Sequence, residues 1–254
     1  MLKIRRIQVE ETPVYDITVP ETESFFANNI LVHNCAEVVL PTNEDRTAVC
    51  CLSSLNLEYA DEWLSNPIFI RDVAEFLDNV LQKFIDDAPD SISRARYSAM
   101  MERSIGVGTL GFHAYLQRKN IAFESAAARA ANIKIFKHIH RELETASLAL
   151  GKERGEAPDA IGYGHRFTYK SAIAPNASSS LIVGNTSPSI EPRRANIYRQ
   201  DTLSGAYVTK NRYLDNLIKT YAATKPEGWY EEVWSNILIN DGSVQHVDWL
   251  DGRE

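Results

Sequence analysis

The stretch "FFANNILVHNCAEVVLPT", residues 25–42, decides how the chain is organised, because the sequence changes character at the bond between Asn34 and Cys35. Upstream of this bond, short apolar runs end in a His-Asn-Cys tripeptide, which suits the rearrangement of a peptide bond. Downstream, a glutamate follows the cysteine by two residues, which suits chemistry on a thiol. We therefore expect two domains, at residues 1–34 and 35–254.

The composition is that of a globular protein, and its charge argues against nucleic acids and anionic membranes as partners. Of the 254 residues, 44% are hydrophobic, which is enough for a sizeable core. The net charge of −7 gives no support to binding of DNA, RNA or an anionic membrane surface. No apolar run reaches the roughly 20 residues that span a bilayer, and the N-terminus lacks the apolar core of a signal peptide. We expect a cytoplasmic protein.

The spacing of the cysteines and histidines predicts neither a metal site nor a set of structural disulfides. The three cysteines are Cys35, Cys50 and Cys51, an odd number that makes no structural disulfide framework. No Cys-x-x-Cys or His/Cys cluster indicates a metal site. His138 and His140 are two residues apart on an expected helix, so they point in different directions, and we expect them to face solvent.

Strands are expected before the boundary and helices after it. Alternation in "PVYDITVP" and the apolar run "NILVH" predict two short strands. Asn66-Pro67 reads as the start of a helix whose apolar pattern stops before Pro89. A long helix is predicted from about Ser125 to Arg154, ended by Gly155, and a last helix in "EGWYEEVWSNILIND".

The segment "GVGTLG", residues 106–111, carries three glycines. Its spacing is not that of a Gly-x-Gly-x-x-Gly dinucleotide loop after a clear strand. We interpret these glycines as sites of close helix packing.

The bond between Asn34 and Cys35 has the groups that peptide rearrangement needs. An asparagine amide can attack its own backbone carbonyl, form a succinimide and so break the bond that follows. His33 can assist as a general acid. The Cys35 thiol can first accept an acyl group as a nucleophile.

The string "VYDITVPETESFFANNILVHN" followed by cysteine strongly resembles the C-terminal end of an intein of the Hint type, a protein-splicing element. The resemblance covers residues 14–35. It implies four roles, namely cyclisation by Asn34, assistance by the penultimate His33, Cys35 as the first residue of the downstream host protein, and assistance by the block aspartate Asp16. Many members carry a histidine where this chain has Glu23-Ser24, so the resemblance assigns no assisting group there.

Only 34 residues precede the boundary, whereas the N-terminal nucleophile of an intein lies far upstream. We therefore expect the C-terminal piece of a split intein, which needs a complementary N-terminal fragment as partner. The alternative is a longer intein of which this sequence is a part. In either case 34 residues are too few for a full core.

From Cys35 to about residue 250 the chain resembles the large chain of class I ribonucleotide reductase. Four stretches carry the resemblance, "CAEVVLPT", "AVCCLSSLNL", "APNASSSLIVGN" and "RRANIYRQDTLSGAYVTKN". The resemblance implies that Cys35 forms a thiyl radical, that Glu37 is the catalytic glutamate and that Cys50 is one of two cysteines that reduce the substrate. It implies that a loop binds the substrate diphosphate, formed by Pro175, Asn176, Ala177, Ser178 and Ser179.

These residue types suit that chemistry. A thiyl radical can abstract hydrogen from the 3′ carbon of a ribose, and a nearby carboxylate can take the 3′-hydroxyl proton. A thiol pair supplies the reducing equivalents. Small residues in the loop let backbone N–H groups approach an anion, and the N-terminus of a helix starting there would favour phosphate.

The resemblance also implies the fold class and the partners. The fold expected is mixed α/β, with a short β-rich intein fragment followed by part of a ten-stranded α/β barrel with many helices. The chain itself is expected to hold no cofactor, since a metal-containing small subunit supplies the radical and a thioredoxin- or glutaredoxin-type protein supplies the reductant. The substrate is a ribonucleoside diphosphate, and the completed large chain is expected to form a homodimer.

Some parts of the family pattern lie outside this sequence, including the second redox cysteine and the radical-transfer tyrosines. By itself, therefore, the chain is not expected to reduce nucleotides. Two other classes stay open, a non-catalytic nucleotide-binding module and a decayed gene fragment that does not splice.

Overall fold

The computed structural model describes residues 24–27, 30–33, 38–202 and 205–250. The chain divides into two compact units, Met1–Val39 and Leu40–Glu254, each of which is described by itself. The strand predicted in "PVYDITVP" lies outside the described residues.

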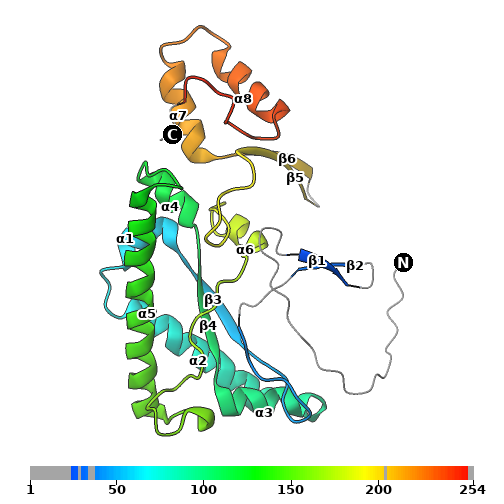
Figure 1. The fold of residues 1–254 in the computed structure, drawn as a ribbon, viewed down its shortest axis with the longest axis vertical. Coiled ribbons are helices and arrows are strands. Elements are labelled where there is room, and N and C mark those ends of the chain that lie inside the picture. Colours follow the sequence, from blue (N-terminus) through cyan, green and yellow to red (C-terminus); the bar gives the residue numbers. More distant parts are fainter. Residues whose placement is uncertain (1–23, 28–29, 34–37, 203–204, 251–254) are drawn as a thin grey trace. The chain divides into compact units, whose positions relative to one another are not determined.

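The described chain is mixed α/β and mostly helical (Figure 1). Its strands are β1 (Ser24–Ala27), β2 (Ile30–His33), β3 (Cys51–Asn56), β4 (Ile105–Leu110), β5 (Ile197–Thr202) and β6 (Gly205–Lys210). Its α-helices are α1 (Ala60–Trp63), α2 (Phe69–Asp87), α3 (Ser93–Glu102), α4 (Phe112–Arg118), α5 (Ala126–Arg154), α6 (Ala177–Ile182), α7 (Arg212–Ala222) and α8 (Trp229–Ile239). Short 3-10 helices are η1 (Leu57–Tyr59), η2 (Asp90–Ile92) and η3 (Pro158–Ala160).

In the first unit, β1 and β2 form an antiparallel hairpin in which Ser24 pairs with His33 and Ala27 with Ile30. The strand predicted in "NILVH" is therefore confirmed.

In the second unit, β3 and β4 lie parallel, with Cys51 opposite Ile105 and Asn56 opposite Leu110. Residues 169–172 run along the other edge of β4, where the N–H of Ile105 donates to the carbonyl of Tyr169 and the N–H of Ala172 donates to the carbonyl of Val107. These three extended segments lie side by side and position Cys50 and residues 175–179, which are described below.

The interpretation of residues 106–111 as helix packing is wrong, because the glycines Gly106 and Gly108 lie in β4. A Cβ on Gly106 would lie 2.3 Å from Leu52 Cδ2, and a Cβ on Gly108 would lie 2.2 Å from the carbonyl oxygen of Ala172. The glycines therefore allow a close approach between extended segments. Because all six residues of β4 are buried, the strand shows no alternation of polar and apolar residues that the sequence could reveal.

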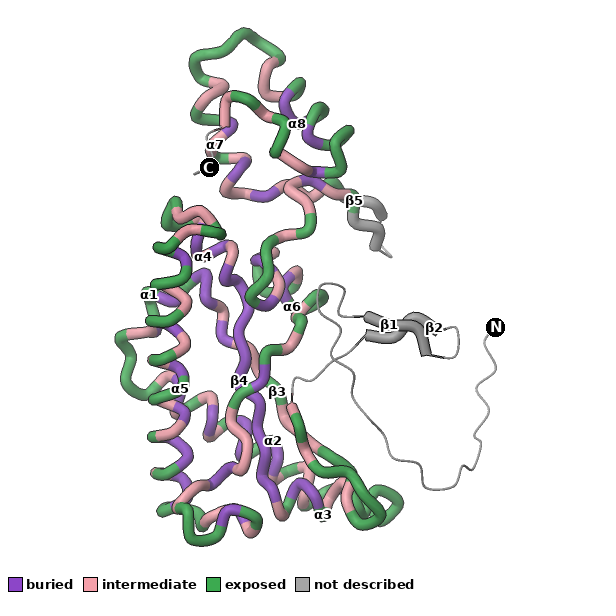
Figure 2. The backbone as a smooth tube through the Cα atoms, in the orientation of Figure 1, coloured by how far each residue is buried: buried purple, intermediate pink, exposed green. Residues whose placement is uncertain are grey.

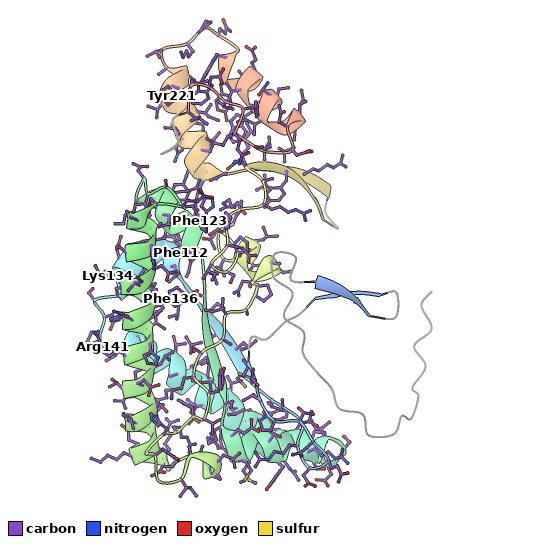
Figure 3. The ribbon with its side chains drawn as sticks, in the orientation of Figure 1. Phe112, Phe123, Lys134, Phe136, Arg141 and Tyr221 are labelled. Carbon is purple, nitrogen blue, oxygen red and sulfur yellow. The ribbon has the colours of Figure 1, made fainter. Side chains whose placement is uncertain are left out.

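Helix α2 packs on one face of β3 and β4, and α5 packs against α2 (Figure 2). Leu55 and Val107 from the strands pack in one core with Leu77 of α2 and Leu143 of α5, all buried. Near this core, the rings of Phe112 and Phe123 meet edge to face with centroids 6.2 Å apart (Figure 3). This core, rather than helix propensity alone, holds the long helices in place.

A second core joins β5, α7 and α8. Its buried members are Ile197, Leu214, Ile218, Val233, Trp234 and Ile237. Among the described residues, no helix is both long and apolar enough to cross a membrane.

The helix predictions hold at most boundaries. The Ser125 side chain caps α5, which ends at Arg154 before Gly155, and α8 lies within the predicted last helix. Asn66-Pro67 is not the start of α2, because the Asn66 side chain accepts a hydrogen bond from the N–H of Ile68 in a turn that precedes the helix. That helix ends before Pro89, as the apolar pattern predicts.

His140 is exposed as expected, but His138 is only half-exposed and its Nδ1 lies 3.0 Å from Arg141 Nη2. In the described part of the chain, no cluster of His, Cys, Asp and Glu could hold a metal ion.

Candidate functional site

Most residues predicted to act at the boundary lie outside the described residues. These are Asp16, Asn34, Cys35 and Glu37, while His33 ends β2 and only its backbone is described. Their roles stay predictions.

Cys50 immediately precedes β3 and is half-buried as a free thiol. Its Sγ and the Cβ of Ala172 both lie close to Gly106, at 3.2 Å and 2.9 Å from the point where a Cβ on that glycine would be. The absence of a side chain at Gly106 thus makes room for the thiol beside the segment that leads into the predicted diphosphate loop.

Burial, together with smaller effects of the neighbouring Cys51 and Glu102, raises the pKa of the Cys50 thiol to about 12. Since a thiol reacts as a thiolate, Cys50 is held in its unreactive, protonated form. Cys51 points the other way along the strand, packs against the core between the sheet and α2, and has its pKa raised by burial.

Glu102 and Arg46 lie on the two segments that lead into β4 and β3. Glu102 is buried and accepts a hydrogen bond from Arg46 Nη1 at 3.3 Å. Arg46 also donates to both carboxylate oxygens of Asp159, one of them at 3.1 Å. Burial raises the pKa of Glu102, against the opposing charge of Arg46. The sequence did not indicate this group, because its members are far apart along the chain.

The predicted diphosphate loop follows the extended segment 169–172 and runs into α6. Asn176 has a left-handed backbone with φ of 54°, and its Nδ2 donates to the carbonyls of Ala174 at 2.7 Å and Thr109 at 3.3 Å. Ser179 Oγ donates to Asn176 Oδ1 at 3.2 Å. These two side chains therefore shape the loop itself, and the backbone N–H groups at the start of α6 are the groups left for an anion.

A cavity of about 1180 Å³ lies beside α6. Ala177, Ser180 and Leu181 of the helix line it, together with Arg193 and Arg194 from the following segment. Glu191 and Asp241 also line this cavity, so its charged groups are of both signs.

The family model described as "Ribonucleotide reductase, barrel domain" matches residues 23–162 and 158–250. The ribonucleoside-diphosphate reductase large subunit of Invertebrate iridescent virus 6 is 52% identical over 248 residues, which is 97% of this chain and 25% of that protein. The corresponding subunit of Invertebrate iridescent virus 3 is 56% identical over 220 residues, which is 87% of this chain and 35% of that protein.

Among solved structures, the Actinobacillus ureae class Id ribonucleotide reductase alpha subunit aligns with a TM-score of 0.77 and 40% identity, over 87% of this chain and 40% of that one. The chain therefore spans between 25% and 40% of the length of these relatives.

Proposed function

The chain belongs to the ribonucleotide reductase family, as part of the barrel domain of a large subunit, and from this premise we propose that it supplies the thiols and the diphosphate loop for reduction of ribonucleoside diphosphates. The observation that carries the proposal is the position of Cys50. Its thiol lies over Gly106, beside the segment that leads into residues 175–179.

In the proposed reaction, a thiyl radical on Cys35 removes hydrogen from the 3′ carbon, and Glu37 takes the proton of the 3′-hydroxyl. The 2′-hydroxyl leaves as water. Cys50 and a second cysteine, which lies outside this sequence, supply two electrons and two protons and become a disulfide. The hydrogen then returns to the 3′ carbon from Cys35, which regains its radical, and Glu37 returns its proton to the 3′ oxygen.

The diphosphate is proposed to bind at residues 175–179, where the backbone bends through the left-handed Asn176 into α6. Backbone N–H groups at such a bend form an anion-binding concavity. The radical would come from a metal-containing small subunit, and a thioredoxin- or glutaredoxin-type protein would reduce the disulfide. We further propose that the completed large chain is a cytoplasmic homodimer.

We also propose that residues 1–34 are an intein segment, removed by splicing at the bond between Asn34 and Cys35. The support is the sequence of residues 14–35.

One observation favours a second candidate, in which the residues before Cys35 belong to the reductase itself. The match to the barrel-domain model begins at residue 23, upstream of the proposed splice point. The two candidates differ in whether residues 23–34 remain in the active protein.

Intact mass spectrometry tests the splicing proposal. The chain is mixed with a complementary N-terminal intein half fused to a reporter. Splicing predicts loss of residues 1–34 and a new product that joins the reporter to Cys35. Asn34→Ala should block release of the segment, whereas Asn29→Ala, a nearby asparagine, serves as the control. An unchanged mass after the halves have bound would reject splicing and favour the second candidate.

Turnover of the completed large chain with its small subunit tests the reductase proposal. Cys50→Ser is expected to abolish deoxyribonucleotide formation, since serine cannot form the disulfide, while Cys51→Ser should retain it. Full activity of the Cys50→Ser protein would overturn the role given to this thiol.

A further inference from the structure

The residues that follow α6 have an unusual backbone. Gly184 and Asn185 both lie in the left-handed region, with φ of 91° and 53°. Glycine adopts this conformation freely, and asparagine tolerates it better than most residues. Two arginines that follow later in the chain bind this turn.

Two guanidinium groups bind the carbonyl oxygens of these residues. Arg212 Nη1 donates to the carbonyl of Gly184 at 3.3 Å, and Arg193 Nη2 donates to the carbonyl of Asn185. Arg193 Nη1 also lies 3.4 Å from the Asn185 side-chain oxygen. Hydrogen bonds from a charged donor are roughly twice as strong as neutral ones.

Arg212 is itself anchored at the end of β3. Its Nη2 pairs with Oε1 of Glu58, which is buried, and the same oxygen accepts a hydrogen bond from Tyr213 at 2.5 Å. Arg118 Nη1 donates to the Glu58 carbonyl at 2.9 Å. The first turn of α7 is thereby connected to the strand that begins next to Cys50.

Arg193 is anchored to α4. Its backbone N–H donates to Nδ1 of His113 at 3.1 Å. Burial, together with the charge of Arg193, lowers the pKa of His113 to about 4, so this imidazole is neutral near pH 7 and can accept that bond.

We propose that Arg193 and Arg212 form a clamp that fixes residues 184 and 185 and, through them, α6 and the diphosphate loop, which makes the two arginines positioning residues for substrate binding. The inference rests on the proposed function of residues 175–179. The loop's own bonds transmit the effect, because the N–H of Thr186 donates to the carbonyl of Ser180 and the N–H of Ser180 donates to the carbonyl of Asn176, both at 3.0 Å. Without the clamp, the hydrogen bonds of Thr186 and Ser180 would open more often. The diphosphate loop would then be less ordered.

Hydrogen exchange in the full chain tests the clamp without any ligand. Arg193→Met and Arg212→Met keep most of the side-chain length and remove the donors. Exchange at the hydrogen-bonded amides of Ser180, Val183 and Thr186 should become about tenfold faster or more in both variants. Exchange in β4 should not change, which shows that the variants fold.

Two further variants act as controls. Arg194→Met removes a positive charge from the same cavity wall and should leave loop exchange unchanged. Arg212→Lys keeps one charged donor and should restore part of the protection. If loop exchange is equal in the original chain and in both Met variants, the clamp is refuted.

Calorimetric titration with cytidine diphosphate then separates the clamp from the proposed function. Weaker binding in Arg193→Met and Arg212→Met, with binding partly restored in Arg212→Lys, supports both proposals. If loop exchange accelerates but cytidine diphosphate binds equally well, the clamp orders the loop and its role in substrate binding is refuted. If the original chain binds no cytidine diphosphate, binding by this part of the reductase is refuted, and the exchange data alone decide on the clamp.

Discussion

The two faces of the β3–β4 pair differ in what covers them. On one face, Leu55 and Val107 are buried under α2 and α5. On the other face, Leu52 is 48% exposed and Cys50 lies beside glycines. The face under the helices holds the main core, and the opposite face, which residues 169–172 partly cover, carries the thiol proposed to reduce the substrate. We therefore expect loss of a core side chain to affect stability and a change at Cys50 to affect reactivity.

The side under the helices also contains an ion cluster centred on Asp78 of α2, which is buried. Arg103 Nη2 binds its carboxylate at 2.6 Å, Arg166 Nε at 3.1 Å and Arg154 Nη1 at 3.0 Å. Three cations around one carboxylate connect α2 with the ends of α3 and α5. Removing one partner of such a buried pair leaves uncompensated charge.

The largest effect should follow from Asp78→Asn. We expect it to lower the free energy of unfolding by about 3–5 kcal/mol, because the buried guanidinium groups of Arg103 and Arg166 lose their carboxylate. Urea unfolding measures the change, with Asp86→Asn, an exposed acid on the same helix, as the control. A loss below about 1 kcal/mol would mean that the face under the helices does not depend on this cluster.

Asp78→Asn should also change how the free energy of unfolding depends on pH under acidic conditions. Burial opposes ionisation of Asp78, but its bonds to Arg103 and Arg166 outweigh burial and lower its pKa. For a lowered pKa, the stabilisation is complete above the unfolded-state value of about 3.9 and is lost as pH falls towards the folded-state value. The Asp78→Asn protein should therefore lose less stability than the original chain as pH falls below about 4.

Gly108→Ala should give the next largest effect and tests the packing of residue 172 against β4. The new Cβ would lie 2.2 Å from the carbonyl oxygen of Ala172, which is backbone and cannot rotate away. We expect a loss of about 1–3 kcal/mol from overpacking, measured by urea unfolding. Ser54→Ala, opposite Gly108 in β3, is the control and should cost less. If Gly108→Ala is neutral, the segment at residue 172 can move and does not pack rigidly against β4.

The sequence predicted the helices, which have a local apolar pattern, but not the β4 strand or the long-range ion pairs. Apolar periodicity predicted α2, although not its first residue, because amphipathic helices repeat within a few residues, and the terminal residues predicted α5. The β4 strand was misinterpreted, since a strand buried throughout has no polar face. The bonds of Arg212 could not be predicted, because its partner Glu58 is 154 residues away and pairing at that distance leaves no local pattern.

Cys50 should show a steep pH dependence, which sharpens the contrast between exposure and reactivity. With its pKa raised to about 12 by burial, the rate of iodoacetamide alkylation should rise about tenfold per pH unit between about pH 7 and 10. Peptide mass spectrometry separates Cys50 from the other cysteines. In urea the same thiol should level off near its ordinary pKa of about 8.5. A plateau below about pH 9 in the folded chain would contradict a buried, protonated thiol.

The smallest effect should come from Arg71→Ala, which tests whether burial is what makes the Asp78 cluster important. Arg71 of α2 pairs with Glu153 of α5 at 2.7 Å, so it joins the same two helices as Asp78 and Arg154, but its side chain is 42% exposed. Water screens an exposed pair, and we expect a loss of at most about 0.5 kcal/mol by urea unfolding. The difference from the original chain should vanish at about 1 M salt, where the screening length is about 3 Å. If Arg71→Ala instead costs as much as Asp78→Asn, the connection between the two helices, rather than the dry environment of its charges, is what stabilises the face under the helices.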